Sequence, residues 1–219
     1  MQFTKNKLHQ YLFFFILLIY FIFNGGNSNL LIQINFILTA ILFVYSINDK
    51  NYKSHLINFF TRNKISIYFY FLFLSFIFIQ FVPLPIDYIK FISYKKYEYL
   101  NLLSSNLKYS TISLSQSDTF FQFLNYFSLI IILFIIKMIF YKSLHVKRFY
   151  IFLSTVGALF SVFAVIMYLS GNPDFFFIIN VYHYKDSSTG FFINRTVFSI
   201  FLLFCLLASL ELQKFLIIE

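Results

Sequence analysis

Six long runs of apolar residues divide this chain, and they constrain its fold more than any other feature. The runs are Leu8–Phe23, Leu30–Ile47, Ile65–Val82, Phe120–Phe140, Phe149–Leu169 and Val197–Leu212. Hydrophobic residues make up 60% of the chain and charged residues only 11%, too few charges to cover a water-soluble domain of this size. A helix of about 20 apolar residues crosses the hydrocarbon core of a bilayer. The sequence therefore predicts an all-α, polytopic membrane protein with about six transmembrane helices in a single domain, residues 1–219.

Lysine and arginine are unevenly distributed between the connections, and this distribution orients the runs. The basic-rich segments are the N-terminus, Asn48–Lys64 and Tyr141–Arg148, whereas the basic-poor ones are Asn24–Asn29, Pro83–Thr119 and Ser170–Thr196. Loops rich in lysine and arginine stay on the cytoplasmic side of a membrane. We therefore expect both termini in the cytoplasm and the two long connections, third and fifth, on the outer face.

The charge and the cysteine content exclude several classes of function. A net charge of +9 is accounted for by cationic loops that orient membrane helices, so we expect membrane lipid and not nucleic acid as a partner. The one cysteine, Cys205, lies in the last run, so neither an intramolecular disulfide nor a cysteine-based metal site is possible. The pattern indicates no metal and no cofactor.

The third connection leaves the membrane through a proline motif, Val82-Pro83-Leu84-Pro85. Proline cannot continue a helix, so the third span ends there. The following residues, Ile86 to Tyr94, place apolar side chains between Asp87 and Lys90 with helical spacing. This pattern predicts a short amphipathic helix that lies along the outer interface.

The fifth connection ends in a motif that precedes the last span, Thr189-Gly-Phe-Phe-Ile-Asn-Arg195. Gly190 permits backbone geometry that other residues resist. Asn194 and Arg195 are expected at the outer N-terminus of the last helix, where free amides, the helix dipole and a guanidinium suit a phosphate group. From the residues alone, that phosphate belongs either to a specific ligand or to a membrane lipid. His183, which precedes the motif, has the character of an ordinary loop histidine.

These motifs, taken in order, resemble the O-antigen ligase and O-antigen polymerase family of bacterial envelope enzymes. The glycine motif resembles the family's "Thr-Gly-x-Phe-x-Asn-Arg/Pro" opening of a membrane helix, and Pro83-Leu84-Pro85 resembles its proline exit. An outside loop then ends in Ile112-Ser-Leu114 and Thr119, and two spans follow before the glycine motif. The resemblance covers about Ile65 to Leu210.

The resemblance implies a multi-pass glycosyltransferase of the bacterial cytoplasmic (inner) membrane. Such enzymes take a glycan from undecaprenyl diphosphate on the outer face and transfer it to a sugar hydroxyl, without a metal or a nucleotide-sugar donor. The acceptor is lipid A–core for a ligase, and another carrier-linked repeat unit for a polymerase. On this reading Arg195 binds the donor diphosphate, Asn194 supports it and Gly190 shapes the turn, while the catalytic residues stay unassigned.

The chain departs from the family in its length. Relatives have many more spans, and their large outside loop with functional arginine and histidine residues follows the glycine motif. Residues 187–219 thus resemble the truncated start of a ligase-like core. We expect the chain to be part of a larger enzyme and inactive on its own.

Two alternatives come from other functional classes. A fragment of a polysaccharide flippase or transporter requires polar residues at mid-membrane, and the runs offer little beyond Gln33, Asn35 and Asn125. A non-catalytic accessory membrane protein requires small residues at which helices approach closely. Gly157 with Ala158, and Ala208 with Ser209, are such positions.

Overall fold

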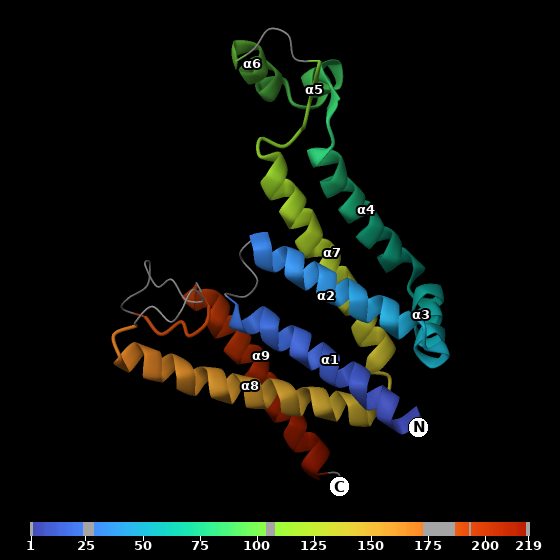
Figure 1. Ribbon diagram of the computed structural model, residues 1–219, viewed down its shortest axis with the longest axis vertical. Helices are drawn as coiled ribbons and strands as arrows, with labels where there is room; N and C mark the ends of the chain where they lie inside the picture. Colours follow the sequence, from blue (N-terminus) through green and yellow to red (C-terminus); the bar gives the residue numbers. More distant parts are fainter. Residues whose placement is uncertain (1, 24–28, 104–107, 173–186, 193, 218–219) are drawn as a thin grey trace.

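The computed structural model describes residues 2–23, 29–103, 108–172, 187–192 and 194–217, and this part of the chain is predominantly helical (Figure 1). The helices are α1 Gln2–Ile22, α2 Asn29–Ile47, α3 Lys50–Arg62, α4 Lys64–Phe81, α5 Ile86–Ile92, α6 Tyr94–Leu103, α7 Gln116–Ile139, α8 Ser143–Leu169 and α9 Arg195–Ile217. Two short strands, β1 Leu84–Pro85 and β2 Tyr109–Ser110, pair antiparallel. The predicted all-α class is confirmed.

Among the described residues, five helices are long and apolar enough to cross a membrane: α2, α4, α7, α8 and α9. They contain five of the six predicted runs, except for the last residue of two runs, Val82 and Phe140, so the chain is a multi-pass membrane protein. The first run differs, because the apolar part of α1, Leu8–Ile22, is shorter than the other five. Polar residues such as Lys5 and Lys7 occupy the beginning of that helix, so α1 is long but only partly apolar.

The basic second connection folds differently from the loop that we expected. It forms α3, which begins where the Asp49 carboxylate accepts a hydrogen bond from the Asn51 amide, 2.9 Å away. One face of α3 is buried through Tyr52 and Leu56, while its lysines remain exposed. The connection is therefore an amphipathic helix. Its many charged residues made it resemble a loop, so the helical spacing of its apolar residues was not recognised.

Two apolar clusters hold most of the long helices together. The first joins α1, α2, α3 and α7 around the fully buried Ile135 and Met138. The second joins α8 and α9 around Phe160 and Phe201. The ring of Phe21 on α1 lies 4.8 Å from that of Phe201, so α1 contacts both clusters.

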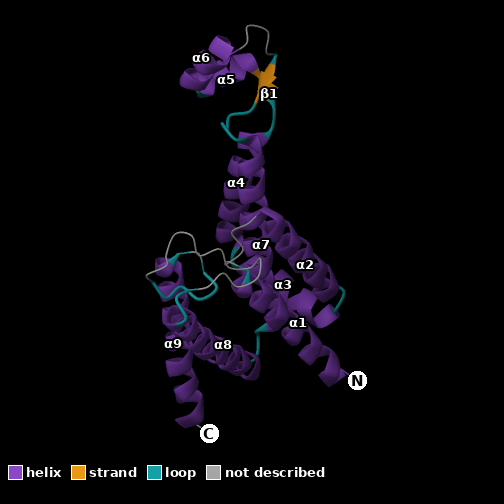
Figure 2. Cartoon of the chain, turned by 60° about the vertical axis from the view of Figure 1, so that its left-hand side comes forward, coloured by secondary structure: helices purple, strands orange, loops and turns teal. Residues whose placement is uncertain are grey.

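α4 and α7 lie side by side, and a small unit closes their far end (Figures 1 and 2). We call this unit the cap; its described residues are 84–103 and 108–115 and include the β1–β2 pair, α5 and α6. The expected amphipathic helix over Ile86–Tyr94 is thus split at Ser93, where α5 ends and α6 begins.

Candidate functional site

The C-terminal end of α8 is closed by a left-handed turn that leads toward the glycine motif. Gly171 and Asn172 have φ angles of 79° and 51°, and the Asn172 amide donates to the Met167 carbonyl at 2.8 Å. The Asn172 side chain also donates to the Ser187 carbonyl, 3.2 Å away. This bond ties the end of α8 to the segment Ser187–Phe192, which we call the glycine turn.

Gly190 lies at the centre of the glycine turn and is buried against α8. Its φ of 56° is in the left-handed region, and a Cβ placed there would lie 3.2 Å from the Cβ of Ala164. The Phe192 amide donates to the Thr189 carbonyl at 3.0 Å and closes the turn. Both the backbone angle and the close contact require glycine, as the sequence predicted for its geometry.

Two phenylalanines anchor the glycine turn to the helix pair. The Phe191 ring stacks on Phe163 at a centroid distance of 4.2 Å. Phe192 is buried and packs against Phe198 and Phe201 of α9, at 5.6 Å and 5.1 Å. The motif is therefore a structural clamp between α8 and α9, a role that its spacing alone did not reveal.

Asn194 and Arg195 lie at the beginning of α9, as predicted, but their side chains are engaged differently. The Oδ1 atom of Asn194 accepts from the Thr196 amide at 2.8 Å, so this side chain caps the helix. Arg195 is the first helical residue, and its side chain is exposed. Of the three candidates, Gly190 shapes the backbone, Asn194 caps α9, and Arg195 presents its guanidinium outward. His183 lies outside the described residues.

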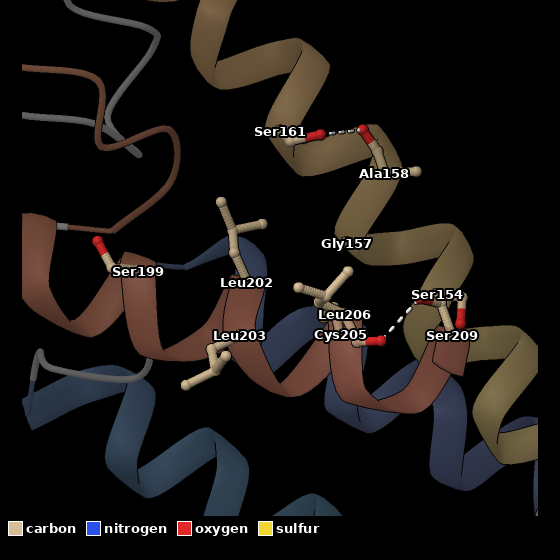
Figure 3. Close-up of a pocket in the computed structure, with 10 residues that line it drawn as sticks. All are labelled: Ser154, Gly157, Ala158, Ser161, Ser199, Leu202, Leu203, Cys205, Leu206 and Ser209. Carbon is tan, nitrogen blue, oxygen red and sulfur yellow. Dashed lines mark hydrogen bonds between the residues drawn. The ribbon is translucent and has the colours of Figure 1, made fainter. Parts of the chain in front are cut away.

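The α8–α9 pair also carries a groove of about 570 Å³ (Figure 3). It follows from a very close helix crossing, because a Cβ on Gly157 would lie only 2.4 Å from the Cβ of Cys205. The walls are mostly small residues, Ser154, Ala158 and Ser161 from α8 and Ser199 and Ser209 from α9. The hydroxyls of Ser161, Ser199 and Ser209 each donate to a carbonyl of their own helix. Gly157 is thus a position of close helix approach within the chain, and its approach to a helix of a partner protein stays a prediction.

The cap holds a second concave site, which sequence reasoning missed. Its volume is about 670 Å³, and its lining is Ser93, Lys95, Lys96, Tyr99, Ile112 and Leu114. Lys96 is only 8% exposed, and its ammonium donates to the carbonyls of Thr111 and Ser113 and to the Thr111 hydroxyl. Burial lowers the pKa of Lys96 from its ordinary value. We call this concavity the lysine pocket.

A polar and aromatic cluster gathers where α1, α2, α3 and α8 meet. Arg148 donates to the Gln10 side chain at 3.1 Å, and the His9 ring stacks on Tyr45 at 4.5 Å. The ring of Tyr52 also contacts His9, at 4.9 Å, and burial raises the pKa of Tyr52. These contacts join residues that are distant in the sequence, so no local motif predicts them.

The described residues include no group of three or more histidine, cysteine or carboxylate side chains arranged to hold a metal ion. The Thr189–Arg195 motif consists of the glycine turn, the Asn194 cap of α9 and the exposed Arg195. Comparison of the chain with known protein families, with curated proteins and with solved structures found no match.

Proposed function

We propose that this chain forms the membrane-embedded part of an O-antigen ligase- or polymerase-like enzyme. It acts on the outer face of the bacterial cytoplasmic membrane and handles a glycan linked to undecaprenyl diphosphate. The observation that carries the proposal is the fold of the Thr189–Arg195 motif. A buried glycine turn and an asparagine cap fix the start of α9 and leave the guanidinium of Arg195 exposed there.

The chemistry of transfer explains why such an arginine is useful. When a sugar hydroxyl attacks the glycan, undecaprenyl diphosphate leaves and negative charge grows on its bridging oxygen. A guanidinium can donate two parallel hydrogen bonds to phosphate oxygens, and it stays charged at any physiological pH. The amides in the first turn of α9 add partial positive charge at the same end. Arg195 then binds the donor and stabilises the leaving group.

The orientation that we propose for the chain is consistent with this assignment. In this proposal α1 makes the sixth crossing through its apolar part, Leu8–Ile22, which is about 22 Å long, and its polar first turns lie at the cytoplasmic interface. Six crossings bring both termini to the cytoplasm and put the cap and the start of α9 on the outer face, in agreement with the lysine and arginine distribution. α5 and α6 then lie at the outer interface.

The test is the replacement of Arg195 in the intact protein, in cells that make the glycan. Arg195→Ala should abolish envelope glycan, and Arg195→Lys should restore only part of it because lysine lacks the planar fork. Lys214→Ala is the matched control, since Lys214 is an exposed cation at the other end of α9. Membrane levels of each variant are followed by immunoblot, and glycan by gel staining. Normal glycan with Arg195→Ala removes Arg195 from the mechanism.

The α8–α9 groove favours a second candidate, a non-catalytic accessory subunit. Small residues let helices approach closely inside a bilayer, and a groove of serine and alanine fits a transmembrane helix of a partner protein. Ala158→Leu fills the groove and should release such a partner after mild detergent extraction, whereas Leu159→Ala, at a lipid-exposed position, should not. If Ala158→Leu leaves all co-purifying proteins bound, the accessory role is wrong.

A further inference from the structure

The lysine pocket is a built feature of the cap and not a gap between loose loops. Lys96 on α6 reaches across to the segment that leads into α7 and bonds two of its carbonyls. That segment is tied in turn to α4, because the Ser113 amide donates to the Gln80 carbonyl at 2.9 Å. The Gln116 side chain donates to the Phe81 carbonyl at 3.1 Å and adds a second tie. The walls of the pocket are therefore fixed to α6 and to the end of α4.

The pocket carries positive charge that its own walls do not neutralise. The Lys96 ammonium donates its hydrogen bonds to neutral oxygens, and no carboxylate is among the residues that line the pocket. Lys95 lines the same pocket and is exposed. The hydroxyl-bearing side chains of Ser93 and Tyr99 complete the polar part. A buried cation without a counter-ion is costly, so this arrangement favours an anion in the pocket.

The rest of the lining is apolar, and the cap exposes further large apolar side chains. Ile112 and Leu114 form this part, and Leu114 is 82% exposed. Other large apolar side chains of the cap are also exposed, with Phe91 at 91% and Leu102 at 87%. The cap closes the end of two membrane-spanning helices, so acyl chains can cover these residues. An occupant of the pocket therefore meets cations on one side and lipid on the other.

We infer that the lysine pocket binds the anionic phosphate headgroup of a membrane lipid. Lys95 contacts the phosphate oxygens, Lys96 contributes its fixed charge, and the Ser93 and Tyr99 hydroxyls donate hydrogen bonds. The first methylenes of the lipid lie on Ile112 and Leu114. This site belongs to the connection after α4, so it goes beyond the role proposed for Arg195. The same phosphate chemistry would also admit free phosphate, and the experiment separates the two.

The test uses the full chain, purified in detergent and titrated with phosphatidic acid, phosphatidylcholine or inorganic phosphate, with binding followed by native mass spectrometry. We expect phosphatidic acid to bind at least tenfold more tightly than zwitterionic phosphatidylcholine. Lys95→Gln should weaken phosphatidic acid about tenfold, the loss of one charge-assisted hydrogen bond. Lys108→Gln is the matched control, an exposed lysine of the same cap outside the pocket, and it should change the affinity less than twofold.

Two results would overturn the inference. Equal affinity of Lys95→Gln and the wild type for phosphatidic acid would exclude the pocket as the site. Complete displacement of phosphatidic acid by an equal concentration of inorganic phosphate would identify free phosphate as the ligand and exclude a lipid. Lys96 is left unchanged throughout, because its replacement also removes the ties that build the pocket.

Discussion

The helix pairs α4–α7 and α8–α9 pack in opposite ways. α8 and α9 approach until Gly157 touches Cys205, with no room for another methyl group. α4 and α7 meet through large rings, including Phe81 against Phe120 and Phe123, each at 5.5 Å. The first pair depends on the absence of a side chain, the second on bulky ones.

The connections within the two helix pairs also differ in the kind of contact that holds them. The glycine turn between α8 and α9 is held by apolar contacts of Phe191 and Phe192. The cap between α4 and α7 is held by polar bonds, above all those of Lys96. A tight pair offers a smooth apolar surface on which a connection can be buried. The α4–α7 pair is spaced by aromatic rings, so the cap that connects these two helices is held by its own polar bonds. The cap contains the lysine pocket.

The largest effect is expected from adding a methyl group where α8 and α9 cross most closely. Gly157→Ala should destabilise the pair by about 3 kcal/mol, because the new Cβ overlaps Cys205. Thermal denaturation in detergent micelles measures this loss. Cys205→Gly in the same chain removes the overlapping atoms and should recover most of it. Failure of the double variant to recover would show that the crossing is not what limits stability.

Next in size is the removal of the polar tether of the cap. Lys96→Met keeps the length of the side chain but leaves the Thr111 and Ser113 carbonyls without its bonds, a loss of about 2 kcal/mol. Hydrogen exchange should rise in residues 108–115 and stay unchanged in α8 and α9. Lys95→Met, at the exposed neighbouring position, serves as the control. Equal exchange in the two variants would contradict the tether.

A smaller effect tests the glycine turn. Gly190→Ala should cost about 1.5 kcal/mol from its left-handed backbone, with an added cost from the 3.2 Å contact to Ala164. Gly171→Ala provides the comparison, since its φ is 79° and a Cβ there meets nothing within 4 Å. Denaturation midpoints of the two variants separate backbone strain from crowding. If the Gly190 variant is no less stable than the Gly171 variant, the turn is not tightly packed on α8.

The smallest effect concerns the rings between α4 and α7. Phe81→Leu removes one partner of the edge-to-face contacts and should cost about 1 kcal/mol. Phe76→Leu is the control on the same helix, at a position 63% exposed. A loss of the same size at Phe76 would mean that ring contacts do not stabilise this pair.

Much of the fold was predictable because the signals are local. Each apolar run specified a helix, and Pro83 specified where α4 ends, since a run of apolar residues and a missing amide act within one segment. α3 was missed because its lysines resembled a loop, and its buried face, Tyr52 and Leu56, became visible only with α7 beside it. The run Leu8–Phe23 was predicted as a span, but its described helix has a shorter apolar part.

The candidate site was predictable in position but not in the roles of its residues. The motif placed Gly190, Asn194 and Arg195 at the start of a membrane helix, and the structure has them there. The cap that the Asn194 oxygen makes on α9 was not part of the prediction, and the expected support of a ligand by Asn194 stays a prediction. The lysine pocket was missed, because its walls come from α6 and from the segment after β2.

By itself, the sequence determined that this chain crosses a membrane several times and which connections are poor in positive charge. Only the tertiary structure decided which of two adjacent lysines is buried, Lys96, and which is exposed, Lys95, and that Gly157 meets Cys205 of α9. The reason is physical. Membrane insertion depends on the composition of each segment, whereas packing depends on matching faces of different helices, and in a bilayer those faces are similarly apolar.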